Sequence, residues 1–210
     1  MPARVKARLS RKADVVRAAI LDAAQAEFME VGFFAASTNR IVVRCGRSKP
    51  TVFRYFPTKT DMLDAVITRI ASRWSDQLHW RDIPVEDPAR WLRVFAARLL
   101  VWILSEESLF LGRLGIAERH IVPHTADIYR RLVSVPMQTI IASRLRAWHK
   151  AGLVDCREAR KGAEVFLDVA ISGMVSRRLY GVMDSPSRAA IDRHVDRVVD
   201  IYLRGLLPRR

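Results

Sequence analysis

The stretch of sequence that decides the fold spans residues 37–59 and reads STNRIVVRCGRSKPTVFRYFPTK. Ser37, or the threonine after it, can cap a short helix that Gly46 interrupts, because hydroxyl oxygens accept bonds from the free N–H groups of a first turn. Ser48 can cap a second short helix, which must end before Pro57, because the residue preceding a proline avoids helical backbone. Two short helices joined by a glycine-containing turn are typical of a helix-turn-helix, whose second helix enters the major groove of DNA.

The two sides of this predicted motif differ in character. Ile41, Val52 and Phe56 can pack inward and hold the two helices at their angle. The outward positions carry hydroxyls and long cationic side chains, which suit phosphate oxygens and base edges. We therefore predict a DNA-binding set made of Thr38, Arg47, Ser48, Lys49, Pro50, Thr51, Arg54, Tyr55 and Lys59. For Arg47, a DNA contact and a solvent-facing position both remain open, and Lys59 is expected near a second run of phosphates.

Charge supports a polyanionic partner. The chain has 210 residues and a formal net charge of +14, of which residues 1–59 carry +8. A basic segment of this kind suits nucleic acid. A generally arginine-rich composition would give a similar excess, because arginine outnumbers lysine along the whole chain. Residues 1–12 form a basic N-terminal arm that either reaches the minor groove or is a disordered tail.

Several other classes of protein are not indicated. Cys45 and Cys156 lie far apart and suggest neither a disulfide framework nor a metal site. The sequence shows no secretory signal and no apolar run of membrane-spanning length, so we expect a cytoplasmic protein without a membrane partner. It has no glycine-rich phosphate loop and no hydrolase or zinc-protease motif, so we expect neither an enzyme nor a cofactor. His120 and His124 have a spacing that could bind a metal, but Pro123 lies between them, and we expect no metal site.

Helical spacing continues along the rest of the chain, without an alternating strand pattern, which predicts an all-α protein of about nine helices. The predicted organisation is a helix-turn-helix DNA-binding domain over 13–60 and a larger helical bundle over 61–207 for ligand sensing and dimerisation. A connecting helix is expected over about 59–79. Two prolines within 80–88 interrupt the periodicity, and we expect a junction between domains there.

Residues 16–67 resemble the DNA-binding domain of the TetR family of bacterial transcriptional regulators. The run SKPTVFRYFPTK at 48–59 is close to the family signature, and further matches precede and follow it. The matching residues are Ile20, Ala24, Phe28, Gly32, Thr38, Ile41, Gly46, Ser48, Thr51, Tyr55, Phe56, Lys59 and Leu63. The chain departs from the pattern at Val42, where alanine is usual, and at Cys45-Gly46-Arg47, where Ala-Gly-Val is usual. Phe53 replaces a common tyrosine, and this removes one expected phosphate contact.

The later part of the chain resembles the C-terminal domain of AefR-like members, through residues 108–118 and the pattern from Leu145 to Val154. The resemblance implies a ligand-responsive repressor that binds a palindromic operator as a homodimer and responds to a small apolar effector. An activator of the same fold remains open, as does a basic helical protein that binds acidic membranes or protein partners.

The resemblance also directs attention to two groups of residues. Candidate effector contacts are Trp102, Phe110, Arg113, Met137 and Trp148, although an aromatic stripe is more often core. Arg113 could instead pair with Glu106 or Glu118. Candidate dimer contacts are Phe166, Ala170, Gly173, Ile191, Val195, Val198 and Tyr202. The alternative is that these stripes face the core of their own chain.

Overall fold

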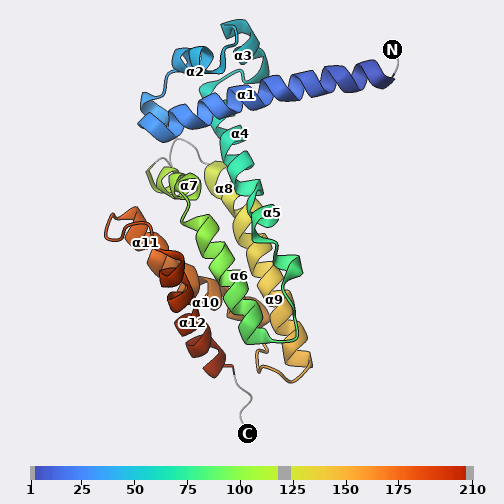
Figure 1. Ribbon diagram of the computed structural model, residues 1–210, viewed down its shortest axis with the longest axis vertical. Helices are drawn as coiled ribbons and strands as arrows, with labels where there is room; N and C mark the ends of the chain where they lie inside the picture. Colours follow the sequence, from blue (N-terminus) through green and yellow to red (C-terminus); the bar gives the residue numbers. More distant parts are fainter. Residues whose placement is uncertain (1–2, 118–123, 207–210) are drawn as a thin grey trace. The chain divides into compact units, whose positions relative to one another are not determined.

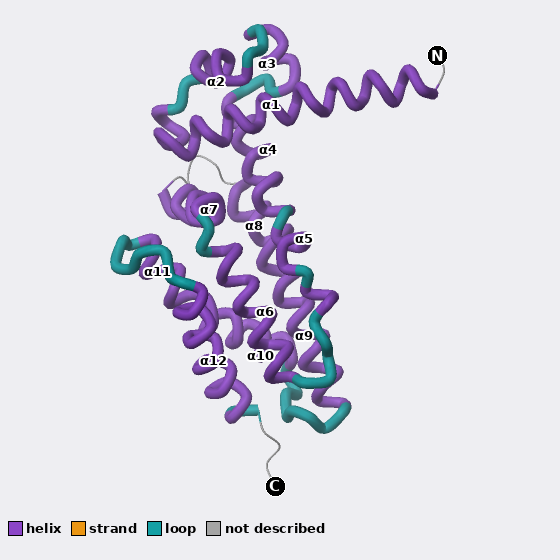
Figure 2. The backbone as a smooth tube through the Cα atoms, in the orientation of Figure 1, coloured by secondary structure: helices purple, strands orange, loops and turns teal. Residues whose placement is uncertain are grey.

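The computed structural model describes residues 3–117 and 124–206, and every regular element in these ranges is a helix (Figures 1 and 2). The α-helices are α1 (Ala3–Ala35), α2 (Thr38–Cys45), α3 (Lys49–Tyr55), α4 (Lys59–Ser72), α5 (Trp74–Leu78), α6 (Pro88–Ile103), α7 (Glu106–Ala117), α8 (His124–Tyr129), α9 (Val135–Lys150), α10 (Ala159–Leu167), α11 (Gly173–Leu179) and α12 (Arg188–Arg204). The pairs α4–α5, α8–α9 and α10–α11 are separated only by one residue or a π-helical turn. The helices of the described residues thus correspond to the nine expected, and the all-α class is confirmed.

The chain divides into two compact units, Met1–Arg69 and Ile70–Arg210, and the division falls within α4. The boundary expected at residue 61 therefore lies nine residues earlier than the start of the second unit at Ile70. The further expectation of a domain junction within 80–88 is wrong, because this segment belongs to the second unit. There it forms a short 3₁₀ turn, η1 (Trp80–Asp82), and a loop, and Asp87 then caps α6 by accepting the N–H of Arg90.

The first unit is built on α1. Ile20, Ala24 and Phe28 recur every fourth residue and are fully buried, as a helical stripe requires. The backbone is already helical from Ala3, so most of the expected arm is a continuation of α1 (Figure 1). The physical reason is composition: alanine, leucine, arginine and lysine are strong helix formers, and no glycine or proline occurs between residue 3 and Gly32.

Gly32 changes the course of the chain at the end of α1. Its φ of 79° and ψ of 166° are not helical, so α1 consists of a long helix and a short turn joined at a kink. A positive φ is strained for any residue with a Cβ, which explains a glycine here. The kink redirects the turn that contains Phe33 toward the start of α4, where the polar contacts described below are formed.

The second unit is a helical bundle around α6. Trp91, Phe95 and Leu99 of α6 are fully buried, and the rings of Trp91 and Phe95 stack at 4.8 Å. Helix α6 packs against α5, α7 and α12, and α9 packs against α10. This core fixes the positions of α9, α10 and α12, which carry most of the residues discussed for ligand binding and dimerisation.

Two π-helical turns interrupt the long helices of the second unit. These are η2 (Arg130–Ser134), between α8 and α9, and η3 (Asp168–Ser172), between α10 and α11. A kink is expected at Pro136 in the first of these runs, and the π-turn lies directly before it. Proline has no N–H for the carbonyl of Leu132, and that carbonyl instead accepts the Nε1–H of Trp74.

Candidate nucleic-acid interface

Helices α2 and α3 form the helix-turn-helix that the sequence predicted. Gly46 ends α2 in the left-handed conformation, with φ 62° and ψ 32°, and its N–H bonds the carbonyl of Val43. The hydroxyl of Ser48 caps α3 by accepting the N–H of Thr51 at 3.4 Å. Proline occupies the first turn of α3, where its missing N–H costs nothing. The turn glycine, the Ser48 cap and the first-turn proline therefore have the structural roles expected of them. The expected cap by the Ser37 side chain is wrong: that side chain accepts no N–H of α2, and the backbone N–H of Ser37 is bound by Glu27 instead.

The inward side of the motif is also as predicted. Ile41 and Val52 are fully buried, and Phe56 is 3% exposed. Helix α2 packs against both α1 and α3, and with these side chains buried the angle between the two short helices is held by apolar packing. The orientation of α3 is therefore a property of the core of this unit and does not depend on contact with DNA.

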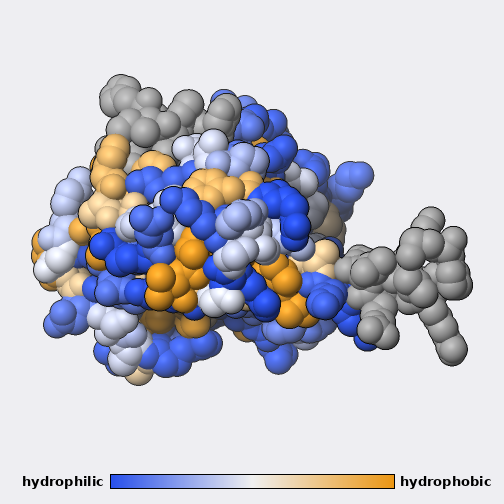
Figure 3. Space-filling view, turned by 90° about the horizontal axis from the view of Figure 1, so that it is seen from above, coloured by the Kyte–Doolittle hydropathy of each residue, from blue (hydrophilic) through white to orange (hydrophobic). Residues whose placement is uncertain are grey.

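The outward side presents the predicted DNA-binding residues in one stretch. Arg47, Ser48, Lys49, Pro50 and Arg54 are exposed. Thr38, Thr51 and Tyr55 are half-buried. Figure 3 shows the face on which α2 and α3 lie, where hydrophilic side chains predominate and small apolar areas lie between them.

The aromatic rings of α3 support its long cationic side chains. The Nζ of Lys49 lies 5.9 Å from the centroid of the Phe53 ring, and the guanidinium of Arg54 lies 5.6 Å from that of Tyr55. Such contacts orient a cation without neutralising its charge. Phe53 thus has a defined contact, although it lacks the hydroxyl that is common at its position.

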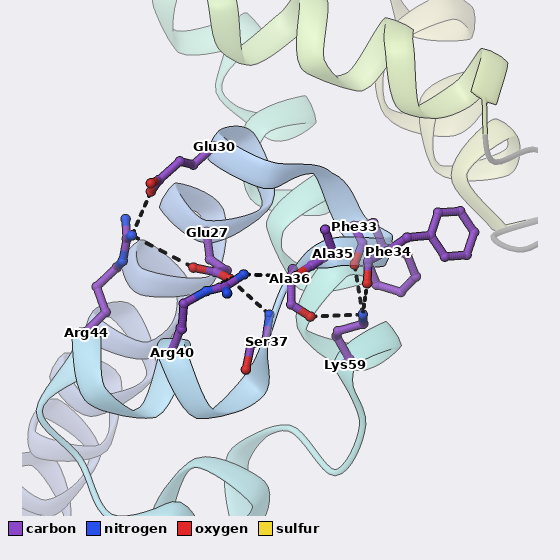
Figure 4. Close-up of polar contacts among 10 residues, drawn as sticks. All are labelled: Glu27, Glu30, Phe33, Phe34, Ala35, Ala36, Ser37, Arg40, Arg44 and Lys59. Atoms are coloured by element: carbon purple, nitrogen blue, oxygen red, sulfur yellow. Dashed lines mark hydrogen bonds and ion pairs between the residues drawn. The ribbon is translucent and has the colours of Figure 1, made fainter.

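Lys59 requires a correction. It was expected near phosphates, but its Nζ donates to the carbonyls of Phe33, Phe34 and Ala36 at 2.8, 3.2 and 3.1 Å (Figure 4). It also lies 4.6 Å from the centroid of the Phe33 ring. An ammonium has three N–H groups, and all three are used. Lys59 therefore joins the start of α4 to the end of α1, where the carbonyls left free by the helix end attract a cation.

A buried carboxylate anchors α2 to α1. Glu27 is 1% exposed, and its Oε1 accepts the backbone N–H of Ser37 at 2.9 Å and the Nε of Arg40 at 2.7 Å (Figure 4). Arg44, one turn further along α2, pairs with Glu30 at 2.7 Å. This network was not predicted from the sequence. Its signal was present as two glutamates three apart at the end of α1 and two arginines four apart on α2.

The charge state of Glu27 follows from these contacts. Burial raises the pKa of its carboxyl, because a charged group is disfavoured away from water. The N–H of Ser37 and the guanidiniums of Arg40 and Arg44 act in the opposite direction and dominate. The pKa therefore lies below its ordinary value of 4.5. The carboxylate is charged at neutral pH, as its role as an acceptor requires.

A pocket of about 350 Å³ lies in the second unit, and of the five candidate effector residues only Met137 lines it. Trp102 and Phe110 are buried. Trp148 is also buried and donates its Nε1–H to the carbonyl of Val85 at 2.7 Å. Arg113 is half-exposed and pairs with Glu106 at 3.6 Å, which is one of the two structural pairings expected for it. The aromatic residues of this group are thus core, the alternative weighed from the sequence.

Most of the candidate dimer residues lie inside their own chain. Phe166, Ala170, Ile191, Val195 and Val198 are buried there, as the alternative drawn from the sequence expects. Tyr202 is half-buried and donates its hydroxyl hydrogen to the carbonyl of Gly162 at 2.8 Å, while Gly173 is exposed.

The apolar side chains left on the outside of these helices are different ones. Val165, Val169 and Ile201 are about half exposed or more. By helical register Val165 and Val169 share one outer side of the α10–η3 run, and η3 packs against α12. The apolar stripes that the sequence indicated are those that face the core, because apolar residues recur at helical spacing more regularly on core-facing sides.

Neither a metal site nor a membrane span is found in the described ranges. Within residues 3–117 and 124–206 no three metal-binding side chains gather, and no helix is both long and apolar enough to cross a membrane. The histidine pair at 120 and 124 lies outside the residues whose side chains the structure describes.

Comparison with known proteins identifies both parts of the chain. Residues 20–66 match the family described as bacterial regulatory proteins, tetR family, and residues 90–205 match the AefR-like transcriptional repressor, C-terminal domain. No curated protein matches the chain. The two matched ranges agree with the two resemblances drawn from the sequence.

Solved structures show the same fold at low sequence identity. A TetR-family transcriptional regulator from Mesorhizobium loti MAFF303099 has a TM-score of 0.83 and 23% identity, over 93% of this chain and 98% of that one. The flavonoid-responsive regulator FrrA has a TM-score of 0.73 and 22% identity, over 94% and 100%. A transcriptional regulator from Rhodococcus sp. Rha1 has a TM-score of 0.70 and 19% identity, over 92% and 99%.

Proposed function

Because this chain belongs to the TetR family of DNA-binding transcriptional regulators, we propose that it is a ligand-responsive repressor that binds a palindromic operator as a homodimer. The family match over residues 90–205 alone covers more than half of the chain. The observation that carries the proposal is the exposed basic face of α3 on a buried apolar support. A helix that contacts base edges must be held rigidly and must face outward, and α3 meets both conditions.

In the proposed complex, α3 enters the major groove. Lys49, Thr51 and Arg54 face base edges and phosphates, and Tyr55 contacts the backbone. Arg47 lies in the turn, outside the helix, and is assigned a phosphate contact. Lys59 is no longer assigned to DNA, because its hydrogen-bonding groups are used within the protein. Lys59 instead joins the end of α1 to the start of α4.

A second copy of the chain is expected on the outer side of α10, η3 and α12. Val165, Val169 and Ile201 are apolar and exposed there, and a four-helix bundle of two such helix pairs would cover them. A two-fold protein reads a palindromic site, because each half-site receives one α3.

Regulation is proposed to come from a ligand in the second unit. Helix α4 runs through the division between the two units at residues 69 and 70, so a change in the second unit can shift α4 and with it the spacing of the two reading helices. This is a population shift between a DNA-competent and an incompetent state. A flavonoid-responsive protein of the same fold supports the idea of a small-molecule effector.

The decisive experiment is selection of bound sequences from a pool of random DNA duplexes by the purified full-length protein. A palindromic consensus, bound far more tightly than unrelated duplexes and with steep salt dependence, would support the proposal. Equal affinity for all duplexes would contradict it. Arg54→Ala should relax the preference at particular base pairs, whereas Tyr55→Phe should weaken binding to all sequences alike.

A further inference from the structure

The pocket of about 350 Å³ in the second unit has a distinctive lining. It lies between α6, the run from Tyr129 to Gln138 on the α8–α9 side, and the α10–η3 run. Leu99, Met137 and Ile171 supply apolar walls from three different segments. Glu164 and Asp168 add two carboxylates on the α10–η3 side. Its volume is at the lower end of the usual range for small-molecule pockets, which suits a ligand of roughly a dozen non-hydrogen atoms.

Both π-helical turns border this pocket. Ser134, the last residue of η2, lines one side, and Asp168 and Ile171 of η3 line another. A π-helical turn is rare, because it inserts a residue and disturbs the regular hydrogen bonding of the helix, and such turns are frequent at functional sites. Two π-helical turns border the same pocket, and this observation does not depend on the chemistry of the lining residues.

The charges in the pocket are unbalanced. Glu164 and Asp168 are four residues apart, so their carboxylates lie on one side of the α10–η3 run and repel each other. The Nε of Arg160 lies 3.8 Å from Glu164, but Arg160 is exposed and lines an adjoining groove together with Arg146. Asp168 forms no ion pair within the described part of the chain. Asp168 is exposed and Glu164 is half-buried, so the pocket presents one paired and one unpaired carboxylate beside apolar walls.

We propose that this pocket binds an organic cation with an apolar body, such as an amine that carries an aromatic group. The ammonium lies between Glu164 and Asp168, and the apolar body packs on Leu99, Met137 and Ile171. This inference rests on the proposed function, because it names the class of effector. It also replaces the purely apolar effector expected from the sequence, since an uncharged apolar molecule would leave Asp168 without an ion pair and would gain nothing from the two carboxylates.

The test uses three probes with the same carbon skeleton: phenylbutylamine, phenylbutanol and phenylbutyrate, which are cationic, neutral and anionic at pH 7. Isothermal titration calorimetry on the full-length protein should give an affinity for the amine at least about tenfold above that for the alcohol, with the carboxylate weakest. A Glu164→Gln, Asp168→Asn double variant should bind the amine no better than the alcohol.

Two controls keep the test sharp. A Glu158→Gln, Asp184→Asn double variant makes the same change in net charge at exposed carboxylates outside the pocket and should keep the preference for the amine. Gln138→Phe fills the pocket from a half-buried position and should weaken the amine at least about tenfold with both carboxylates present. Equal affinities for amine and alcohol in the wild-type protein, or binding of none of the probes, would overturn the proposal. So would an unchanged affinity in Gln138→Phe.

Binding to the selected DNA separates this proposal from the proposed function. If the amine binds in the pocket and releases the protein from DNA, both stand. If it binds with the predicted preference but DNA affinity is unchanged, the ligand class stands and the regulatory role of the pocket fails. If the protein ignores DNA altogether, the proposed function fails while the calorimetric result for the pocket remains valid.

Discussion

The role of Lys59 can be tested by replacing it with methionine, which keeps the aliphatic stem and removes the ammonium. The variant cannot form the three bonds to Phe33, Phe34 and Ala36. A hydrogen bond to a charged group contributes about 1.5–3 kcal/mol. Lys59 is only half-buried, so water can replace the ammonium at part of these carbonyls, and we count the net loss as about one such bond. Adding the interaction of a cation with a helix end, about 0.3–1 kcal/mol, we expect the free energy of unfolding to fall by about 2–4 kcal/mol.

Urea unfolding followed by circular dichroism measures this change in stability, and a salt titration of duplex DNA binding measures how many phosphates the protein neutralises. The slope of log affinity against log salt becomes shallower by about 0.9 for each phosphate that is no longer neutralised. Lys59→Met should leave this slope nearly unchanged while stability drops. Lys49→Met is the matched control, because Lys49 is exposed on α3, and it should make the slope shallower with a change in stability within about 0.5 kcal/mol.

The opposite pattern would refute the reasoning. If Lys59→Met unfolds at the wild-type urea concentration and makes the salt slope as shallow as Lys49→Met is expected to, Lys59 binds DNA and its bonds to α1 contribute little. Lys59→Arg distinguishes the two roles in a second way. The bulkier, planar guanidinium should still reach a phosphate, but it should fit poorly among the three converging carbonyls.

Three further predictions concern stability and assembly. Glu27→Gln should lower the free energy of unfolding by about 1–3 kcal/mol at pH 7. Because the folded-state pKa of Glu27 is lowered, its contribution to stability is present above the ordinary pKa and is lost as pH falls. The urea unfolding curves of wild type and variant should therefore converge below about pH 4, and a constant difference would contradict this role. Gly162→Ala should lower stability by about 1–3 kcal/mol, because the added Cβ would lie 2.7 Å from the sulfur of buried Cys156. Gly115→Ala, where the added Cβ meets open space, should be neutral or stabilising. Equal melting temperatures of the two variants would be evidence against the close packing of α10. Val169→Glu should produce a folded monomer in sedimentation velocity, while Val195→Glu, in the core, should unfold the chain; a dimeric Val169→Glu protein would place the interface elsewhere.

Local signals predicted the helix-turn-helix almost completely. The Ser48 cap, the turn glycine and the inward apolar residues depend on neighbours within a few positions, so sequence alone reveals them. Ser48 and Gly46 have the roles expected from residue type, and Ile41 and Val52 are buried as their spacing predicted. The family resemblance rested on the same stretch and is confirmed by the comparisons.

The errors at Lys59, at Glu27 and in the candidate dimer residues share one physical cause: each depends on partners distant in the sequence. The bonds of Lys59 reach back 23 to 26 positions, and those of Glu27 reach forward 10 and 13. Helical periodicity shows that Val195 lies on an apolar side but not whether that side meets its own core or a second chain. Likewise, no local pattern showed that Glu164 lies beside Met137 in one pocket.

The length of α3 has a consequence for how an operator can be found. Seven residues rise about 10 Å, which matches roughly three base pairs of DNA. A given sequence of three base pairs recurs by chance about once in every 64 positions, so a genome of millions of base pairs would contain a vast number of sites that one such helix binds equally well. Two copies at a fixed separation double the number of base pairs contacted and also require the correct spacing between the two half-sites. Because this helix is short, a single chain could bind DNA, but only two chains together could recognise a specific operator.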